Sequence, residues 1–294
     1  MIITISMVVV LTYFLKSNRE VESDASSTNE LRINPTTAVK MPRQVFFSGE
    51  QVPIEVYDVK ERLDRELLVN TYWHSNSIQY FKLASRWFPI IEQILREEGV
   101  PDDFKYLALA ESGLRNVVSH RNAAGVWQFL KSTGKEYGLE VNSVVDERYH
   151  IEKSTRAACK YLNKAYDGLG SWTLAAAAYN AGRPRIKKLL SQQKIDSYYE
   201  LYLGEETARY VFRIVALKII FTNPQNFGFD FKKGDLYEPI CYGTLDVKEG
   251  ISDLPEFAIN QGTNYKTLKL LNPWLRQPYL RNKSKRTYEI KIPG

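Results

Sequence analysis

The sequence predicts a mainly α-helical chain that ends in a small α+β module. Between residues 59 and 221, apolar residues recur at the three- and four-residue spacing of helices. Apolar and polar residues alternate instead at residues 288–293, as in a final strand. Of the 294 residues, 44% are hydrophobic and 25% are charged, which is ordinary for a globular protein with a sizeable core.

The N-terminus is predicted to be an export signal. Residues 2–15 are almost wholly apolar, and Lys16 and Arg19 follow. This run is short for a membrane span, which needs ~20 residues, and it fits a signal-peptide core better. A basic start and a small-residue cleavage site are missing. We interpret residues 1–15 as a signal peptide or a membrane anchor, and residues 16–44, rich in Ser, Asn, Glu and Asp, as a disordered tether.

Helical patterns fill the next part of the chain. Residues 45–71 carry little information beyond a helical pattern at 59–70, and we treat them as a bridging segment. Two helices are predicted at residues 77–86 and 88–98, each with an apolar stripe. Pro89 would stand near the start of the second helix, where proline is tolerated.

A helix that begins near Pro101 carries an apolar stripe that ends in a carboxylate. Residues at positions i, i+3, i+4 and i+7 share one face of it: Phe104, Leu107, Ala108 and Glu111. Ser112 and Gly113 follow at once and can end the helix. The sequence therefore places Glu111 at the edge of a surface that faces the core.

A carboxyl group at the lip of an apolar wall loses hydration, so the pKa of Glu111 should rise. A raised pKa keeps a glutamate protonated near neutral pH, where it can act as a general acid. The alternative is a helix-end glutamate in a salt bridge or in water, because most such residues are structural.

Three motifs occur in order along the chain. They are Glu111-Ser112, then Gly125-Val-Trp-Gln-Phe129, then Ala178-Tyr-Asn-Ala-Gly182. Together they resemble the soluble lytic transglycosylase domain of the lysozyme-like superfamily, and most of all lytic murein transglycosylases of the membrane-bound D type. The resemblance covers over half the chain, and it implies a lysozyme-like helical catalytic domain at residues 72–230. Each motif is weak alone, but three in order are specific.

The resemblance also implies roles for residues around the acid. Glu111 would be the catalytic acid, and Ser112 would orient its carboxyl group through a hydrogen bond. Gln128 would line the sugar cleft near the acid. Trp127 and Phe129 are expected in the core, and residues 127–129 are expected to begin the next helix.

A second part of the cleft is implied at the end of an alanine-rich helix. Ser171 can cap this helix and Gly182 can end it. By resemblance, Tyr179 and Asn180 line the cleft, although without that context they merely end a helix. Arg183-Pro184 replaces a more common Pro-Gly of the family, which leaves the local loop geometry open.

Residues 205–211 resemble a later motif of the family and begin an apolar helix that runs to Phe221. In this motif Tyr210 would bind substrate and close the cleft opposite Glu111. The alternative is a tyrosine that only packs.

Asp146 is a candidate for a second catalytic carboxylate. Ordinary glycosidases use two carboxyl groups, roughly 5–10 Å apart. The resemblance implies one acid, so we interpret Asp146 and Arg148 as a structural ion pair. Ser154 and Thr155 are expected to cap the following helix.

Composition and spacing exclude several other chemistries. The two cysteines and three histidines show no metal-ligand spacing, and no phosphate-binding glycine loop is present, so no metal or organic cofactor is predicted. Cys159 is expected to be a buried free thiol. The net charge of +6 favours an anionic partner, but the charges are scattered, so we predict no nucleic-acid binding.

The C-terminal module resembles a degenerate LysM domain with the order βααβ. After a linker at residues 231–245, residues 246–294 would hold helices at 253–258 and 265–271 and the strand at 288–293. The usual Gly-Asp-Thr-Leu opening is imperfect here. LysM modules recognise N-acetylglucosamine chains, and a small packing or partner-binding domain is the open alternative.

The function implied by the resemblance is that of a cell-wall lytic transglycosylase. Such an enzyme cuts the β-1,4 bond between N-acetylmuramic acid and N-acetylglucosamine and leaves 1,6-anhydro ends, in wall remodelling or turnover. The expected partner is the peptidoglycan glycan strand, and the expected location is the periplasmic envelope, with membrane association through the N-terminus left open. Two alternatives remain: a hydrolytic muramidase on the same fold and a non-catalytic peptidoglycan-binding protein.

Overall fold

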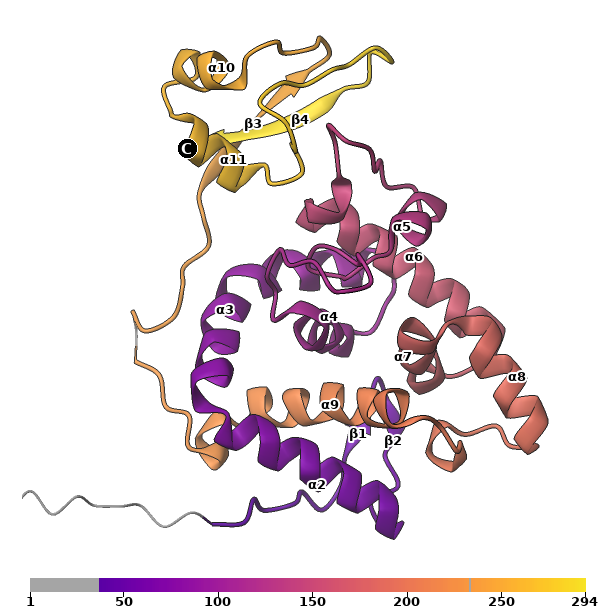
Figure 1. The fold of residues 1–294 in the computed structure, drawn as a ribbon. Coiled ribbons are helices and arrows are strands. Elements are labelled where there is room, and N and C mark those ends of the chain that lie inside the picture. Colours follow the sequence, from indigo (N-terminus) through magenta and orange to yellow (C-terminus); the bar gives the residue numbers. More distant parts are fainter. Residues whose placement is uncertain (1–36, 233) are drawn as a thin grey trace, which may run out of the picture. The chain divides into compact units, whose positions relative to one another are not determined.

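Helices dominate the described part of the chain, which is residues 37–232 and 234–294 of a computed structural model (Figure 1). The predicted signal segment and most of the predicted tether lie outside these residues. A membrane crossing needs a long, apolar helix, and no helix within the described ranges meets that requirement. The elements before the C-terminal module are β1 (Phe46–Phe47), β2 (Glu50–Gln51), α2 (Tyr57–Tyr72), α3 (His74–Glu97), η1 (Asp102–Phe104), α4 (Lys105–Ser112), α5 (Lys131–Glu136), η2 (Glu147–Tyr149), α6 (Ile151–Leu169), α7 (Trp172–Ala181), α8 (Arg183–Gln193), η3 (Tyr198–Glu200), α9 (Glu205–Thr222) and η4 (Pro224–Phe227).

The segment before α3 belongs to the main hydrophobic core. β1 and β2 form an antiparallel hairpin in which Phe46 lies opposite Gln51. Phe47 of the hairpin and Leu63 and Leu67 of α2 are fully buried in the same cluster as α4 and α9. Helix α2 packs along α9 (Figure 1). Residues 45–71, which the sequence analysis treats as a bridging segment, thus pack as part of the helical domain.

A single long helix, α3, replaces the two helices predicted before residue 99. It continues through Pro89, which has no N–H to donate and therefore costs an intrahelical hydrogen bond. Pro89 is exposed, whereas Phe88 and Ile91 beside it are buried in the core. Packing of these flanking side chains outweighs the lost bond, so the predicted break does not occur.

Helix α4 packs against both α3 and α9 (Figure 1). Pro101 precedes the short 3-10 turn η1 and is not itself helical, contrary to expectation. The predicted apolar face is confirmed, because Phe104, Leu107 and Ala108 have no exposed surface. Gly113 adopts a left-handed conformation with φ of +60° and ends the helix, as predicted.

The C-terminal module has the predicted βααβ order. Its elements are β3 (Tyr242–Val247), α10 (Leu254–Asn260), α11 (Tyr265–Leu271) and β4 (Tyr288–Pro293). The two strands are antiparallel, and Val247 lies opposite Tyr288. Strand β3 begins within the stretch interpreted as a linker. Asp253 caps α10 by accepting a hydrogen bond from the Glu256 amide at 2.9 Å.

The module docks against the loop that precedes α6. The Asp146 amide donates to the Trp274 carbonyl at 2.9 Å, and the Arg276 amide donates to the Val144 carbonyl at 2.8 Å. A second apolar cluster contains residues of both bodies, including Val145 of the loop and Leu275 of the module. Main-chain bonds and a shared core therefore fix the module to the helical domain.

Candidate active site

Glu111 lies in the last turn of α4, at the end of the apolar stripe. Glu111 as a whole is half-buried, and its Oε1 accepts a hydrogen bond from the Tyr210 hydroxyl. Burial raises the pKa of Glu111 to about 7, although the Tyr210 hydrogen bond and the charge of Arg213 act in the opposite direction. Glu111 therefore exchanges a proton readily near neutral pH.

Two tyrosines from separate helices border this carboxyl group. Tyr210 of α9 is almost fully buried, and Tyr179 stands near the end of α7. Burial and the charge of Glu111 raise the pKa of both phenols well above the usual value. Both hydroxyls therefore stay protonated and act as donors, Tyr210 to Glu111 and Tyr179 to the Trp127 carbonyl at 2.7 Å.

Gln128 occupies a turn and does not begin a helix, contrary to prediction. Its φ is +50°, and its Nε2 donates to the carbonyls of Gly125 at 2.8 Å and Val117 at 3.0 Å. The close approach of Gly125 to the main chain at Arg148 explains this conformation. A Cβ atom on Gly125, whose φ is +81°, would lie 1.8 Å from the Arg148 carbonyl oxygen. The chain turns back here, and α5 begins only at Lys131.

Gln128, Tyr179 and Asn180 line one pocket of about 280 Å³. Asn180 is exposed, and its Oδ1 accepts a hydrogen bond from the Thr207 hydroxyl at 2.9 Å. Glu111 does not line this pocket, but its charge acts on Tyr179, which does. The structure thus gathers three of the predicted binding residues around one pocket, and one of them, Tyr179, is affected by the charge of the predicted acid.

Ser112 does not orient the Glu111 carboxyl group as predicted. Its side chain is buried, and its hydroxyl donates to the Val126 carbonyl at 2.7 Å, with the Ala108 carbonyl at 3.3 Å. The bond to Val126 ties the end of α4 to the turn that carries Gln128. Ser112 therefore positions that turn.

A buried ion-pair cluster behind the acid was missed by sequence reasoning. Glu66 of α2 is 1% exposed, and its Oε1 accepts a hydrogen bond from the Arg209 Nε at 2.6 Å. Its Oε2 lies 3.7 Å from the Arg213 Nε, and Arg213 also pairs with Glu206 at 3.7 Å. The one available signal was that Glu66 falls on the apolar face of α2, three residues after Leu63.

Asp146 forms the predicted structural ion pair. Its Oδ1 and Oδ2 lie 2.9 Å from Nε and 2.7 Å from Nη2 of Arg148, so the pair is bidentate. Ser154 and Thr155 do not cap α6, which begins at Ile151. Their hydroxyls lie inside the helix and donate to the Ile151 carbonyl.

The structure confirms two further predictions, the ends of α7 and the free thiol of Cys159. Ser171 caps α7 by accepting from the Leu174 amide at 3.2 Å, and Gly182 ends that helix. Cys159 is a buried free thiol, as predicted, and burial raises its pKa to about 12. Across residues 37–232 and 234–294, no three or more Cys, His, Asp or Glu side chains gather where they could hold a metal ion.

The helical domain that contains Glu111 and the C-terminal module each match the model of a known family. Residues 88–201 match the transglycosylase SLT domain, and residues 243–294 match the soluble lytic transglycosylase C-terminal LysM-like domain. The chain therefore contains a region similar to SLT domains, which have a lysozyme-like fold, followed by a region similar to the LysM-like domain.

Among known proteins the chain is similar to the membrane-bound lytic murein transglycosylase D of Escherichia coli strain K12. The two are 30% identical over 247 residues, which is 77% of this chain and 53% of the relative, and the protein of strain O6:H1 gives the same values. A putative tributyltin chloride resistance protein of Alteromonas sp. strain M-1 is 31% identical over 118 residues, or 38% of this chain and 56% of that protein. The chain spans about half the length of the curated relatives it matches.

Proposed function

We propose that this chain is a peptidoglycan lytic transglycosylase. It cuts the β-1,4 bond between N-acetylmuramic acid and N-acetylglucosamine and forms a 1,6-anhydro ring on the muramic acid. The observation that carries the proposal is the half-buried Glu111, whose pKa of about 7 suits it to give and then take one proton. The SLT domain and the similarity to lytic murein transglycosylase D support the same reaction.

In the first step Glu111 acts as the general acid. The Tyr210 hydroxyl donates to Oε1 and so leaves Oε2 as the atom that carries the proton to the glycosidic oxygen. The bond between that oxygen and C1 breaks as the proton arrives. The carbonyl oxygen of the substrate's own N-acetyl group forms a bond to C1 as the glycosidic bond breaks and takes up the developing positive charge, which is a recognised alternative to a second carboxylate.

In the second step the same carboxylate acts as the base. Glu111 takes the proton of the C6 hydroxyl, and the C6 oxygen attacks C1 and displaces the N-acetyl oxygen. The acid is thereby restored, and no water is consumed. The Tyr210 hydrogen bond stabilises the ionised carboxylate between the two steps.

Gln128, Tyr179 and Asn180 are proposed to hold the glycan beside the acid. All three line one pocket. The two hydrogen bonds of the Gln128 side chain use its Nε2, so its amide oxygen is available to a ligand. Ser112 and Tyr179 also keep the turn at residues 125–129 in place through their bonds to main-chain carbonyls. Substrate binding and the shape of the turn are therefore linked.

The proposed place of action is the cell envelope, where peptidoglycan lies. The E. coli relative is named as membrane-bound, and the apolar N-terminal residues of this chain fit export or anchoring. Fractionation of cells that produce the full chain tests this: wall or membrane fractions are expected, and recovery only with cytoplasmic proteins would contradict it.

Mass spectrometry of fragments released from purified peptidoglycan tests the reaction. Anhydro-muropeptides, lighter by one water than hydrolysed fragments, are expected. Reducing muropeptides would instead assign a hydrolytic muramidase, and binding without release would assign a wall-binding protein. Glu111→Gln should bind the wall without releasing fragments, whereas Glu61→Gln, at an exposed site on α2, should act like the native chain.

A further inference from the structure

The β1–β2 hairpin bonds to segments of the fold that form or lead into the site helices α4, α7 and α9, although it lies before residues 88–201, which match the SLT domain. The Lys218 Nζ of α9 donates to the Phe46 carbonyl at 2.8 Å and to the Asp103 Oδ2 at 2.7 Å. The same carboxyl oxygen accepts from the Ser48 amide at 2.6 Å. The hairpin therefore ties α9 to the turn η1, which leads into α4, the helix of Glu111.

Glu50 of β2 makes the contact between the hairpin and α7. Its Oε1 accepts from the Trp172 amide at 2.6 Å. Its Oε2 accepts from the Ser171 hydroxyl at 2.8 Å and from the Thr173 amide at 2.9 Å. The first amides of a helix have no partner within the helix, and the positive end of the helix dipole attracts a carboxylate. Both oxygens of Glu50 therefore hold the N-terminus of α7 through three directional hydrogen bonds.

The turn of the hairpin places Glu50 beside α7. Ser48 and Gly49 have φ values of +52° and +83°, as in the two-residue turns that match the twist of paired strands. Phe47, directly before the turn, is fully buried, and its ring packs against Phe104 with centroids 5.4 Å apart. Glu50 thus extends from a short turn that is anchored in the core.

The directional contacts of α7 lie at its two ends. Its middle, residues 175–178, consists of four fully buried alanines, whose side chains carry no polar group. The far end carries Tyr179 and Asn180, which line the cleft pocket. A helix of 10 residues is a stiff rod about 15 Å long, so a shift at its N-terminus moves the residues at its other end.

We propose that Glu50 is a positioning residue for the cleft, which sets where α7 presents Tyr179 and Asn180 to the glycan. The proposal rests on the proposed function for the identity of the substrate. Glu50 does not line the cleft pocket, and Glu111 has its own hydrogen bond from Tyr210. Loss of the Glu50 contact should therefore weaken binding of the glycan strand and leave proton transfer unchanged.

Steady-state kinetics of fragment release separate positioning from a purely structural role. Glu50→Gln keeps the shape of the side chain, but its amide nitrogen cannot accept a hydrogen bond, so part of the contact with α7 is lost. We expect KM for soluble glycan strands to rise roughly three- to tenfold, with kcat within about twofold of the native value. A purely structural role would lower the folded fraction, and thus kcat, at an unchanged KM. An unchanged KM overturns the proposal.

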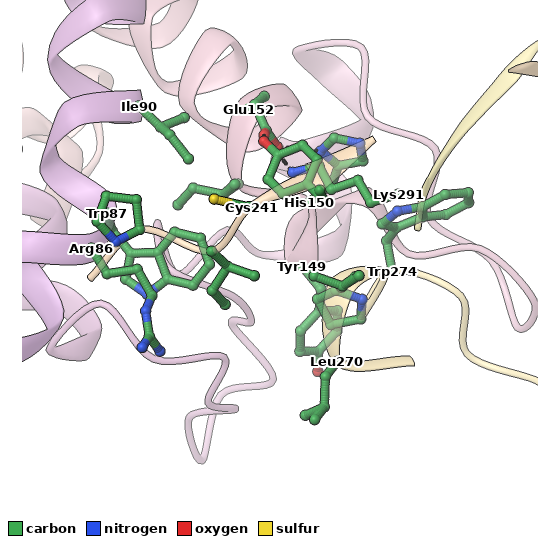
Figure 2. A pocket seen from close by; sticks show the side chains of 16 residues that line it. Arg86, Trp87, Ile90, Tyr149, His150, Glu152, Cys241, Leu270, Trp274 and Lys291 are labelled. Carbon is green, nitrogen blue, oxygen red and sulfur yellow. Dashed lines mark hydrogen bonds and ion pairs between the residues drawn. The ribbon is translucent and has the colours of Figure 1, made fainter. Parts of the chain in front are cut away.

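Two other glutamates allow matched control variants with the same chemical change. Glu55 is exposed on the segment after the hairpin, so Glu55→Gln should change neither constant. Glu152 lies beside His150 and Lys291 in a pocket of about 410 Å³ between α3 and the C-terminal module (Figure 2). Glu152→Gln should therefore lower stability without raising KM. An equal rise in KM for Glu152→Gln and Glu50→Gln would contradict a specific role of Glu50.

Nuclear magnetic resonance of the Asn180 side-chain amide follows the position of α7 without turnover. Asn180→Asp identifies the signal. The signal should move in Glu50→Gln and stay in place in Glu55→Gln and Glu152→Gln. An unmoved signal in folded Glu50→Gln overturns the proposal. This readout does not depend on the release of anhydro-muropeptides, so failure of the proposal and failure of the proposed function are distinguishable.

Glu50→Asp decides the question if Glu50→Gln does not fold. It keeps the negative charge on a side chain that is one carbon shorter, so the charge still favours the N-terminus of α7 but the three hydrogen bonds cannot all form. Its KM is expected to rise about two- to fivefold, with a moved Asn180 signal. A native KM together with a native Asn180 signal in folded Glu50→Asp would overturn the proposal.

Discussion

Glu111 and Glu152 each accept a hydrogen bond from a tyrosine hydroxyl, yet the pKa values of these two carboxyl groups move in opposite directions. Glu111 bonds to Tyr210, and its pKa rises to about 7. Glu152 bonds to Tyr242, and its pKa falls. The difference is direct contact with cationic side chains, since Glu152 contacts Lys291 and lies beside His150.

The comparison shows how the surroundings of a buried carboxyl group decide whether its pKa rises toward neutral pH or falls. Burial favours the neutral form of a carboxyl group, and a phenol alone only partly offsets that. A neighbouring ammonium group favours the ionised form strongly enough to lower the pKa of the carboxyl group. Arg213, whose charge lowers the pKa of Glu111, is itself paired with Glu66 and Glu206, so its effect is limited.

The largest effect is expected when the proton of Glu111 is removed. Glu111→Gln keeps the shape of the side chain but cannot transfer a proton, so release of anhydro-muropeptides should fall roughly 10²–10⁴-fold. Quantified fragment release from purified peptidoglycan measures this. A variant that retains a tenth or more of the native rate would remove Glu111 from the role of acid.

Neutralising the other carboxylate should affect stability and not the chemistry. Glu152→Gln leaves the buried Lys291 ammonium without its counter-charge, which should cost about 2–4 kcal/mol of unfolding free energy at pH 7. Because the folded pKa of Glu152 lies below the unfolded value, this difference should shrink as the pH falls below about 4.5. Urea unfolding measures it.

Glu97→Gln is a suitable control for that measurement, since Glu97 pairs with Arg156 on the surface and should matter little. An unchanged unfolding curve for Glu152→Gln at pH 7 would mean that the charge cluster does not stabilise the docked module.

The same Glu111→Gln change should stabilise the protein at alkaline pH. The folded state holds the Glu111 proton more tightly than the unfolded state, so stability is lost as the pH rises from about 4.5 to 7. The variant avoids this cost and should gain about 1–3 kcal/mol at pH 8 and nothing at pH 4. Equal unfolding curves for both proteins at pH 8 would contradict a raised pKa.

The smallest of these effects is expected at Tyr210, whose hydroxyl donates a hydrogen bond to Glu111. Tyr210→Phe removes the hydrogen bond that favours the carboxylate, so the pKa of Glu111 should rise further and the alkaline limb of the activity profile should move to higher pH. Loss of orientation should lower the rate about tenfold. A rate loss with no movement of the limb would leave Tyr210 a packing residue.

Local sequence patterns predicted correctly that Glu111 ends a buried apolar stripe and that Gly113 ends its helix. Apolar spacing places Glu111 at the end of a buried stripe, and Gly113 and Ser171 act at helix ends as their types suggest. These features depend on residues within one or two turns of each other. The βααβ order of the module was predicted from its resemblance to LysM domains, and the structure has that order.

Features that depend on contacts between distant segments could not be predicted. Gln128 leaves the helical pattern because Gly125 packs against the Arg148 carbonyl, and Pro89 stays inside α3 because its neighbours are buried. The effect of Arg213 on Glu111 depends on the ion pair between Arg213 and Glu66, two residues that lie well over a hundred residues apart in the sequence. Nothing local to these residues signals their partners.

Titration of the Glu111 carboxyl carbon by ¹³C nuclear magnetic resonance tests the central claim most directly. The signal is identified by its absence from Glu111→Gln. We expect a midpoint near pH 7, about 2.5 units above the ordinary value, because the carboxyl group is buried without a directly bound cation. A midpoint near 4.5 would show an ordinary ionised glutamate at neutral pH and would contradict its assignment as the proton donor.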